Sequence, residues 1–274
     1  PIQARDAGLS LPVLVGPENK IREVAEREGI DLHGIRIVDV PHSHASAATA
    51  VRLAREGEVE ALMKGSLHTD ELMSAVVARD TGLRTARRLS HVFMADVPTY
   101  PHPLLITDAA INIEPSLEDK VHIIQNAIEL AIMMGVPEPK VAILSAVETV
   151  NVKIRSTLDA AALCKMADRG QIKGGLLDGP LAFDNAISLV AAKTKGIRSA
   201  VAGQADILVV PDLESGNMVA KQLEYLADAL MAGVVLGARV PIVLTSRADT
   251  AETRTASCAI AQLMAHKRRQ GVRL

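Results

Sequence analysis

Short apolar segments alternate with longer segments of helical period over the first third of the chain. The apolar segments predict strands and the segments between them predict helices. This β, α, β, α, β, α order is typical of βαβ units around a largely parallel sheet. The expected strands are residues 11–15, 35–39 and 60–64, and the expected helices lie near residues 17–28, 44–56 and 69–79.

The rhythm changes at two apolar segments, residues 91–95 and 104–107, which are separated by the proline-rich link 98–103. Such a link between two strands predicts an antiparallel pair or a crossing between domains. A long helix near residues 116–134 follows, and alternation then resumes. The remaining strands are expected at residues 141–145, 174–178, 207–211, 234–236 and 242–245, and the remaining helical segments at 156–168, 184–195, 216–231 and 250–266.

The last strand and helix are too short to fold alone, so we place them with the start of the chain. The expected organisation is a discontinuous first α/β domain, residues 1–99 plus 240–274, with a second α/β domain, residues 100–239, inserted into it. A length of 274 residues is sufficient for two domains of ordinary size.

Composition excludes several classes of partner. Aromatic residues make up 1% of the chain, which disfavours the stacking platforms of single-stranded nucleic-acid binding. The net charge of -2 gives no broad attraction for DNA or an anionic membrane, and we find no apolar run of transmembrane length. Cys164 and Cys258 lie in Ala- and Leu-rich helical patterns and are expected to be reduced and buried. A small molecule is the expected partner.

Five turns that follow predicted strands carry polar residues, and ligands of parallel sheets bind beyond the carboxyl ends of strands. The first is Lys64-Gly-Ser-Leu-His68, where Gly65 lets a ligand approach the backbone and the amides of the next helix can hold an anion. Alternatively, the segment is a tight turn with Thr69 or Asp70 as the N-cap of that helix. Asp108 and Asn112, in Thr107-Asp-Ala-Ala-Ile-Asn112, orient a ligand or pin the turn.

The other turns offer the same choice. Leu177-Asp-Gly-Pro180 breaks the chain after a strand. Gly216 and Asn217 lie at a predicted helix start, with Lys221 one turn later. This arrangement is suited to binding a phosphate or a polar cofactor group. Alternatively, the residues form a capped helix with a solvated lysine.

The turn Thr245-Ser-Arg-Ala-Asp-Thr-Ala-Glu252 is the most informative. Ser246 offers a hydroxyl, and Arg247 offers a planar charged fork that matches phosphate oxygens. Asp249 and Glu252 have the spacing of a capping box, so initiation of the last helix is their ordinary role.

Common catalytic motifs are absent from the chain. We find no G-x-x-x-x-G-K-[ST] loop, no G-x-G-x-x-G after a strand, no G-x-S-x-G elbow and no C-x-x-C or H-E-x-x-H metal spacing. His42 and His44 lack a carboxylate partner at fixed spacing, so a polar loop is the better interpretation than a metal site. Nucleotide hydrolysis, dinucleotide oxidation, hydrolase and zinc chemistry are disfavoured.

Taken together, these segments resemble the phosphate acetyl/butyryltransferase family along essentially the whole chain. The resemblance is strongest to phosphate butyryltransferase-like members, including those fused behind an enoyl-CoA hydratase domain. The chain begins at Pro1, which reads as the middle of an element, so we expect residues upstream of it. The matching segments are Met63-Lys-Gly-Ser-Leu-His-Thr-Asp70, Thr107-Asp-Ala-Ala-Ile-Asn112, Val141-Ala-Ile-Leu-Ser145, Asp206-Ile-Leu-Val-Val-Pro-Asp-Leu-Glu-Ser-Gly-Asn217 and Leu244-Thr-Ser-Arg247.

The resemblance implies a two-domain fold related to isocitrate and isopropylmalate dehydrogenases, with mostly parallel sheets and an interdomain cleft. It also implies a cytoplasmic homodimer that moves an acetyl or butyryl group between coenzyme A and inorganic phosphate by direct attack in a ternary complex. Coenzyme A enters as a substrate, and no tightly bound cofactor, metal, nucleic acid or membrane is expected.

Roles carried over by the resemblance fall first on the last turn. Arg247 would hold phosphate, and Ser246 would hydrogen-bond the carbonyl oxygen or the sulfur. The resemblance does not give the general base: Asp249, Glu252 or an acid from elsewhere in the chain can fill this role, and Asp249 is our candidate. Acetyltransferase members carry a catalytic Asp seven residues after the Ser, where this chain has Thr253. The expected contacts to phosphate or coenzyme A are Lys64, Gly65, Ser66, His68, Arg88, Asp108, Asn112, Gly216, Asn217 and Lys221.

Two other classes stay open. Thr253 at the position of the usual Asp is compatible with a non-catalytic acyl-CoA sensor, like the similar domain that ends some malic enzymes. A metal-dependent hydroxy-acid dehydrogenase on the related fold would need a cluster of inward Asp residues that we do not find. Arg88 has its own alternative, a solvated arginine at a helix end.

Overall fold

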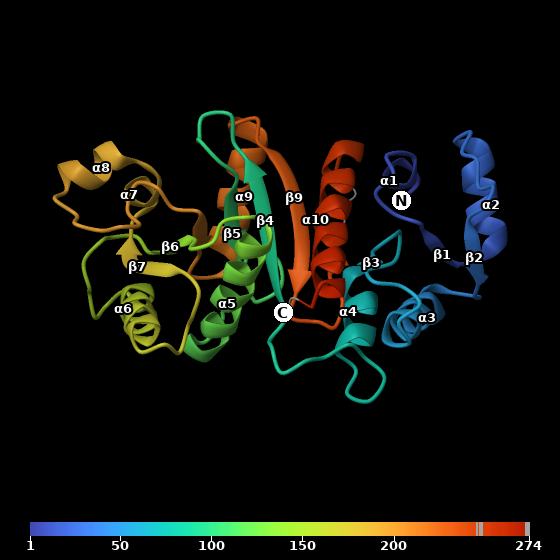
Figure 1. The fold of residues 1–274 in the computed structure, drawn as a ribbon, viewed down its shortest axis with the longest axis horizontal. Coiled ribbons are helices and arrows are strands. Elements are labelled where there is room, and N and C mark those ends of the chain that lie inside the picture. The colour runs from blue at the N-terminus through green and yellow to red at the C-terminus, as the bar shows by residue number, and fades with distance from the viewer. Residues whose placement is uncertain (245, 247–248, 272–274) are drawn as a thin grey trace. The chain divides into compact units, whose positions relative to one another are not determined.

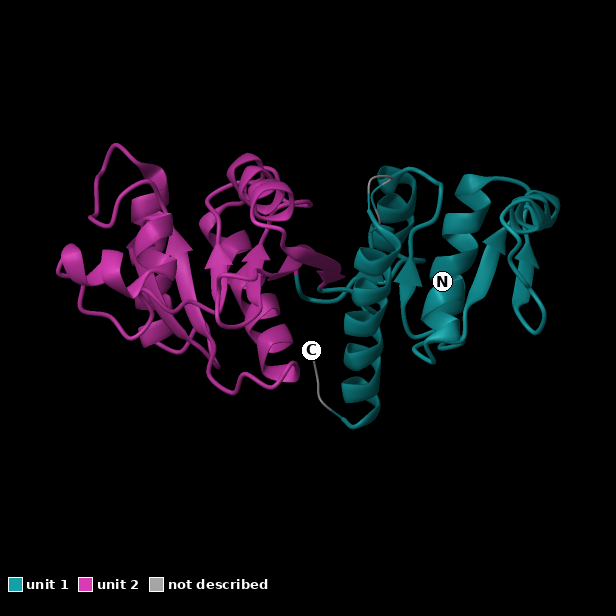
Figure 2. Ribbon diagram, turned by 90° about the horizontal axis from the view of Figure 1, so that it is seen from above, with its two compact units in different colours: residues 1–87, 237–273 teal, residues 88–236, 274 magenta. Residues whose placement is uncertain are grey.

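The computed structural model describes residues 1–244, 246 and 249–271. The chain divides into two compact units, residues 1–87 with 237–273 and residues 88–236, which Figure 2 colours separately. Residues 88–99, expected in the first domain, begin the second unit instead. The reason is that the strand Ser90–Asp96 pairs along its length with two strands of that unit.

The first unit follows the predicted alternation of strands and helices (Figure 1). Strand β1 pairs in parallel with β2, and β3 pairs in parallel with β10. The element ends shift by a few residues from the predicted ones, and helix α1 was not predicted. The elements are α1 Ile2–Asp6, β1 Val13–Gly16, α2 Glu18–Arg27, β2 Arg36–Asp39, α3 Ser43–Arg55, β3 Leu62–Met63, α4 Thr69–Val77, β10 Ile242–Val243 and α10 Ala251–Arg269.

The second unit contains a sheet with the strand order β9-β4-β5-β8-β6-β7. Strand β4 runs antiparallel to both neighbours, which confirms the antiparallel pair predicted around the proline-rich link, and the other pairs are parallel. The elements are β4 Ser90–Asp96, β5 Leu104–Thr107, α5 Leu117–Met133, β6 Lys140–Leu144, α6 Arg155–Asp168, β7 Leu176–Leu181, α7 Phe183–Ile187, α8 Leu189–Thr194, β8 Ile207–Val209, α9 Leu213–Leu226 and β9 Leu230–Leu236.

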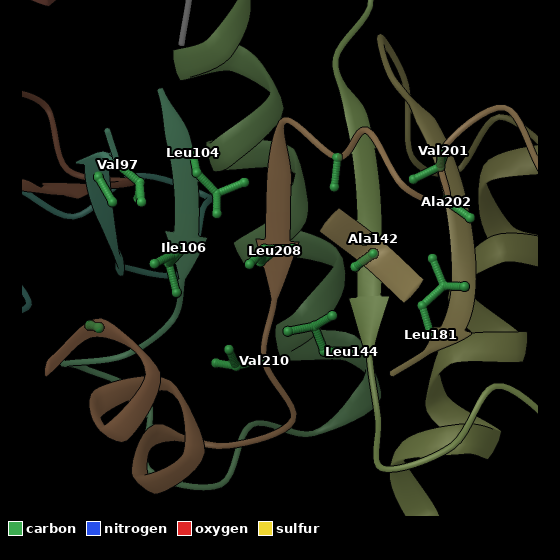
Figure 3. Packing of buried hydrophobic residues seen from close by; sticks show 14 of the residues in the cluster. Val97, Leu104, Ile106, Ala142, Leu144, Leu181, Val201, Ala202, Leu208 and Val210 are labelled. Atoms are coloured by element: carbon green, nitrogen blue, oxygen red, sulfur yellow. The ribbon is translucent and has the colours of Figure 1, made fainter. Parts of the chain in front are cut away.

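Helices cover both faces of this sheet. One face carries Leu104, Ile106 and Leu208, which form a buried cluster with side chains of α7, α8 and α9 (Figure 3). Because side chains alternate along a strand, the intervening residues face the other side, where α5 packs on β4, β5 and β8 and α6 packs on β6 and β7. Aliphatic residues and alanine fill this core, as the scarcity of aromatic residues predicts.

No helix among the described residues is both long enough and apolar enough to span a bilayer. Cys164 and Cys258 are free thiols, and they are partly buried where burial was expected.

Candidate active-site residues

Two of the predicted polar turns lie side by side in the second unit. Strands β5 and β8 are parallel neighbours with Thr107 opposite Val209, so the turns that follow them leave the same edge of the sheet. The Val210 N–H donates to the Thr107 carbonyl at 2.9 Å, and the Leu213 N–H donates to the Ile113 carbonyl at 3.0 Å. The structure therefore brings segments 107–112 and 211–217 together at a carboxyl edge, where parallel sheets bind ligands.

Gly216 has a packing role in this arrangement. A Cβ added there would lie 2.6 Å from the Val210 Cγ2 atom and 2.9 Å from the Ala109 Cβ atom, so only glycine allows α9 to pack this closely on the turn after β5. The predicted start of the helix at residue 216 was wrong. Helix α9 begins at Leu213 because the Asp212 side chain caps it by accepting the Ser215 N–H at 2.8 Å.

Asn217 and Lys221 therefore lie within α9 rather than at its start. Asn217 is exposed. The Lys221 Nζ atom is 2.7 Å from a Glu224 carboxylate oxygen and 5.4 Å from the centre of the Tyr225 ring. Both side chains stand on a solvent-facing part of the helix, one and two turns beyond the turn after β8.

Arg88, Asp108 and Asn112 form one hydrogen-bonded group. The Arg88 Nε donates to the Asn112 Oδ1 atom at 2.5 Å, and Arg88 also pairs with Asp119 at 2.9 Å. Buried Asp108 accepts four hydrogen bonds, from the N–H groups of residues 110, 111 and 112 and from the Asn112 amide. Asp108 thus pins the turn and holds Asn112, and Asn112 orients the half-exposed guanidinium of Arg88.

His91 is a buried titratable residue that sequence reasoning missed. It is 2% exposed, packs edge-on against Phe93, and its Nδ1 atom has no hydrogen-bond partner among the described residues. Burial lowers the pKa of His91 to about 4, although the nearby Asp108 charge acts in the opposite direction. The imidazole is therefore neutral at pH 7, and it lies near Asp108 of the hydrogen-bonded group that holds Arg88.

This burial makes stability depend on pH. The folded pKa of His91, about 4, lies below the ordinary histidine value of 6.5, so its contribution to stability is present above pH 6.5 and is lost as pH falls towards 4. Each pKa unit corresponds to about 1.4 kcal/mol, so we expect a loss on the order of 3 kcal/mol by pH 4. The measurement is the urea midpoint between pH 4 and 8 for the native chain and for His91→Gln.

The His91→Gln variant should show a flatter profile over this window, even if it is less stable at pH 7. His102→Gln, at a half-exposed histidine of the same unit, is the control and should keep the native slope. A native slope in His91→Gln would show that other groups cause the acid sensitivity.

In the first unit, the turns after β3 and β10 also leave one sheet edge. Met63 lies opposite Val243 in the parallel pair, and the Lys64 N–H donates to the Val243 carbonyl at 2.9 Å. The candidate segment 64–68 therefore lies at the same carboxyl edge of this strand pair as the end of β10, which the described residues Ser246 and Asp249 follow in the chain.

The Lys64 side chain closes its own turn by donating to the carbonyls of Gly65 and Leu67, each at 3.2 Å. His68, rather than Thr69 or Asp70, is the N-cap of α4, and its N–H donates to Glu71 at 2.8 Å. Gly65, Ser66 and His68 are exposed, and no atom of the described residues other than the two chain neighbours lies within 4 Å of a Cβ built on Gly65. The approach of a ligand to the backbone at Gly65 stays a prediction from the sequence.

Glu71 joins this turn to the start of α3. Its carboxylate accepts the Ser43 hydroxyl at 2.6 Å and lies 3.4 Å from the His44 Nε2 atom. The Ser43 hydrogen bond, followed by the His68 N–H, lowers the pKa of Glu71 below its usual value. Despite the histidines nearby, no group of three metal-ligating side chains occurs within the described part of the chain.

The main chain of Ser246 is held by two side chains. Its N–H donates to the Asp249 Oδ2 atom at 2.7 Å, and its carbonyl accepts from the Arg254 Nη2 atom at 3.1 Å. Arg247, the most informative residue of the sequence pattern, lies outside the described residues. Arg254 was missed in the sequence, because only its reach back to Ser246 distinguishes it from an ordinary helix arginine.

The capping box expected from Asp249 and Glu252 was wrong. Thr250 is the N-cap of α10, and its side chain accepts the Thr253 N–H at 3.1 Å. Asp249 lies outside the helix and is bound to Ser246. The Thr253 hydroxyl lies 3.1 Å from the Thr250 hydroxyl, so this position contributes to the cap of the helix and holds no carboxylate.

Comparisons with known proteins point to one family. A family model described as phosphate acetyl/butaryl transferase matches residues 43–262. The chain is 66% identical to a phosphate acetyltransferase of Rhizobium meliloti over 98% of this chain and 85% of that protein. It is 42% identical to a phosphate butyryltransferase of Clostridium acetobutylicum over 96% and 87% of the two lengths.

Among solved structures, a branched-chain phosphotransacylase from Enterococcus faecalis V583 superposes with a TM-score of 0.78 at 30% identity, covering 93% of this chain and 99% of that one. The predicted mixed α/β fold with a mostly parallel sheet is confirmed. Because the family model and these relatives extend over most of its length, the chain belongs to the phosphate acetyl/butaryl transferase family.

Proposed function

We propose that this protein catalyses acyl transfer between coenzyme A and inorganic phosphate, acyl-CoA + phosphate = acyl phosphate + CoA. The observation that carries the proposal is the 66% identity to a phosphate acetyltransferase along nearly the whole chain. At the reacting centre a phosphate oxygen attacks the thioester carbonyl carbon, the new C–O bond forms, and the C–S bond breaks to release the thiolate of coenzyme A. No covalent acyl-enzyme is needed, because both substrates are present together.

The turn after β10 is proposed as the catalytic segment. Arg247 holds phosphate and offsets its charge, and Ser246 donates its hydroxyl to the carbonyl oxygen or the departing sulfur. The hydrogen bonds on both sides of the Ser246 peptide support this role, because a donor must be fixed before charge develops in order to stabilise it.

Asp249 remains our proposed general base for the reverse reaction, in which the thiol of coenzyme A must lose a proton. Its Oδ2 atom already accepts the Ser246 N–H, so the same carboxylate also braces the turn. Thr253, the position at which acetyltransferase members carry the acid, has only a hydroxyl that takes part in the helix cap. Asp249 is the carboxylate bound directly to the Ser246 main chain.

The remaining candidates are proposed to bind the substrates. Arg88 is suited to an anionic group, because Asn112 and Asp119 orient a guanidinium that is still half exposed. Asp108 and Asn112 act through Arg88, since their polar atoms are bonded inside the protein, and Gly216 acts by allowing close packing. Substrate contacts are proposed for the exposed residues Gly65, Ser66, His68 and Asn217 and for the partly buried Lys64 and Lys221.

The finer fold assignment also stays a proposal, namely an isocitrate/isopropylmalate dehydrogenase-like fold. A cytoplasmic homodimer is proposed on the family resemblance, with acyl-CoA and phosphate as the small-molecule partners. Coenzyme A is treated throughout as a substrate and not as a bound cofactor.

The direct test is to mix the purified protein with acetyl-, propionyl- or butyryl-CoA and measure thiol release with and without inorganic phosphate. Hydroxylamine added in parallel traps any acyl phosphate as a hydroxamate. Phosphate-dependent release with matching hydroxamate establishes the transferase and ranks the acyl chains. Release without phosphate would indicate a thioesterase, and binding without release would indicate an acyl-CoA sensor.

A further inference from the structure

Arg254 connects the last helix to the turn that carries Ser246. It lies in the first turn of α10, and its Nη2 atom donates to the Ser246 carbonyl oxygen at 3.1 Å. The contact joins two residues eight positions apart, across the N-cap of the helix. A guanidinium bound to a main-chain carbonyl fixes the orientation of that peptide group.

Both the main-chain N–H and the main-chain carbonyl of Ser246 are hydrogen-bonded. Arg254 binds its carbonyl, while the Asp249 carboxylate accepts its N–H at 2.7 Å and the Asp249 N–H approaches the same carbonyl at 3.3 Å. Both polar main-chain groups of Ser246 are therefore engaged. This restricts the backbone from which the Ser246 side chain projects.

Helix stability does not explain an arginine at this position. Positive charge is unfavourable near a helix N-terminus, where the helix dipole is positive, and is favoured in the last turn. In addition, the Arg254 Nε atom is buried and has no hydrogen-bond partner among the described residues, and such groups are rare and costly in native proteins. Features that oppose local stability are expected at functional sites.

From these contacts we propose that Arg254 is a positioning residue for acyl transfer, which holds the Ser246 peptide so that its hydroxyl meets the reacting thioester. The proposal rests on the proposed function and adds to it a residue that lies outside Leu244-Thr-Ser-Arg247, the segment that resembles the family. Arg254 acts through Ser246, so its loss slows the chemical step more than it weakens substrate binding. Misplacement of a catalytic group by about 1 Å can cost on the order of 100-fold in rate.

The matched control is Arg268, on the same helix. Its guanidinium also donates to main-chain carbonyls of a preceding loop, at Ala238 and Arg239, yet it lies at the opposite end of α10 from Ser246. Arg268→Met therefore removes the same kind of contact between helix and loop without touching the catalytic turn. Both variants remove one positive charge from the same helix.

The experiment compares kcat and KM for acetyl-CoA and phosphate in the native chain, Arg254→Met, Arg254→Lys and Arg268→Met, with thermal unfolding of each. We expect Arg254→Met to lower kcat about 10- to 100-fold with KM values within about 2-fold. Arg254→Lys should recover part of kcat, because it keeps a donor but loses the fork. Guanidinium ion added at millimolar concentration should partly restore Arg254→Met and leave Arg268→Met unchanged.

An unchanged kcat in Arg254→Met, or an equal loss in Arg268→Met, would overturn the proposal. If Arg254→Met does not fold, Arg254→Lys decides the question by its kcat, and a native kcat in that variant counts against a need for the fork. Absence of phosphate-dependent turnover in the native chain is a separate result, because it rejects the proposed function before any variant is compared.

Discussion

Replacing Arg247 by alanine is expected to remove phosphate-dependent thiol release almost completely, with kcat/KM reduced by at least about 1000-fold. The planar guanidinium can bind two phosphate oxygens at once and offset the charge that builds up during attack on the thioester. Loss of one preorganised charge-stabilising donor typically costs 100- to 1000-fold, and here the substrate contact is lost as well. The measurement is steady-state kinetics with acetyl-CoA and phosphate as varied substrates.

Arg198→Ala provides the control for the loss of one positive charge, because Arg198 is exposed and lies between α8 and β8. It should keep native kinetics. Arg247→Lys should fall between the alanine variant and the native chain, since lysine retains the charge as a point without the bidentate geometry. Near-native kinetics in Arg247→Ala would reject the assignment of this residue to phosphate.

Replacing Lys120 by methionine is expected to cause the largest loss of stability, about 3–5 kcal/mol. The Lys120 Nζ atom binds the Asp159 Oδ2 atom at 2.7 Å between α5 and α6, where the two side chains are only 6% and 11% exposed. Without the lysine, Asp159 remains as a buried charge with no opposite charge to balance it. The measurement is urea denaturation at pH 7, read as the shift of the midpoint.

Two further variants make this prediction specific. Lys120→Met combined with Asp159→Leu should recover most of the stability, because replacement of both charges by apolar side chains leaves nothing unpaired. Lys165→Met, on the same helix as Asp159, breaks an exposed pair with Asp168 and should leave the midpoint unchanged. Equal effects in Lys120→Met and Lys165→Met would show that the buried pair contributes nothing beyond a surface pair.

The order of strands and helices was predictable because periodicity is a local property. The alternation of the first unit, the antiparallel strands around residues 98–103 and the later parallel strands all appear where the pattern placed them, with ends shifted by a few residues. The boundary between the two units was harder to predict from the sequence. The strand Ser90–Asp96 is assigned by its pairing with β5 and β9, and no local pattern specifies those partners.

Helix starts were predicted less well, because a cap depends on the geometry of a single side chain. Asp212, His68 and Thr250 are the observed N-caps of α9, α4 and α10, whereas the spacing of polar residues favoured others. Several polar residues fitted each turn, and the tertiary path of the chain selected among them.

The sequence by itself determined the class of fold, the family and the set of polar turns, because element periods, turn residues and short motifs are written along the chain. Only the tertiary structure decided which of these residues act together. Arg88 meets Asn112 from 24 positions away, Gly216 is required by its contact with Ala109, and Arg254 reaches Ser246 across a helix cap. The first contact arises because antiparallel pairing places the start of β4 beside the end of β5, and the second because parallel β5 and β8 bring their turns to one edge. Local spacing does not encode this proximity.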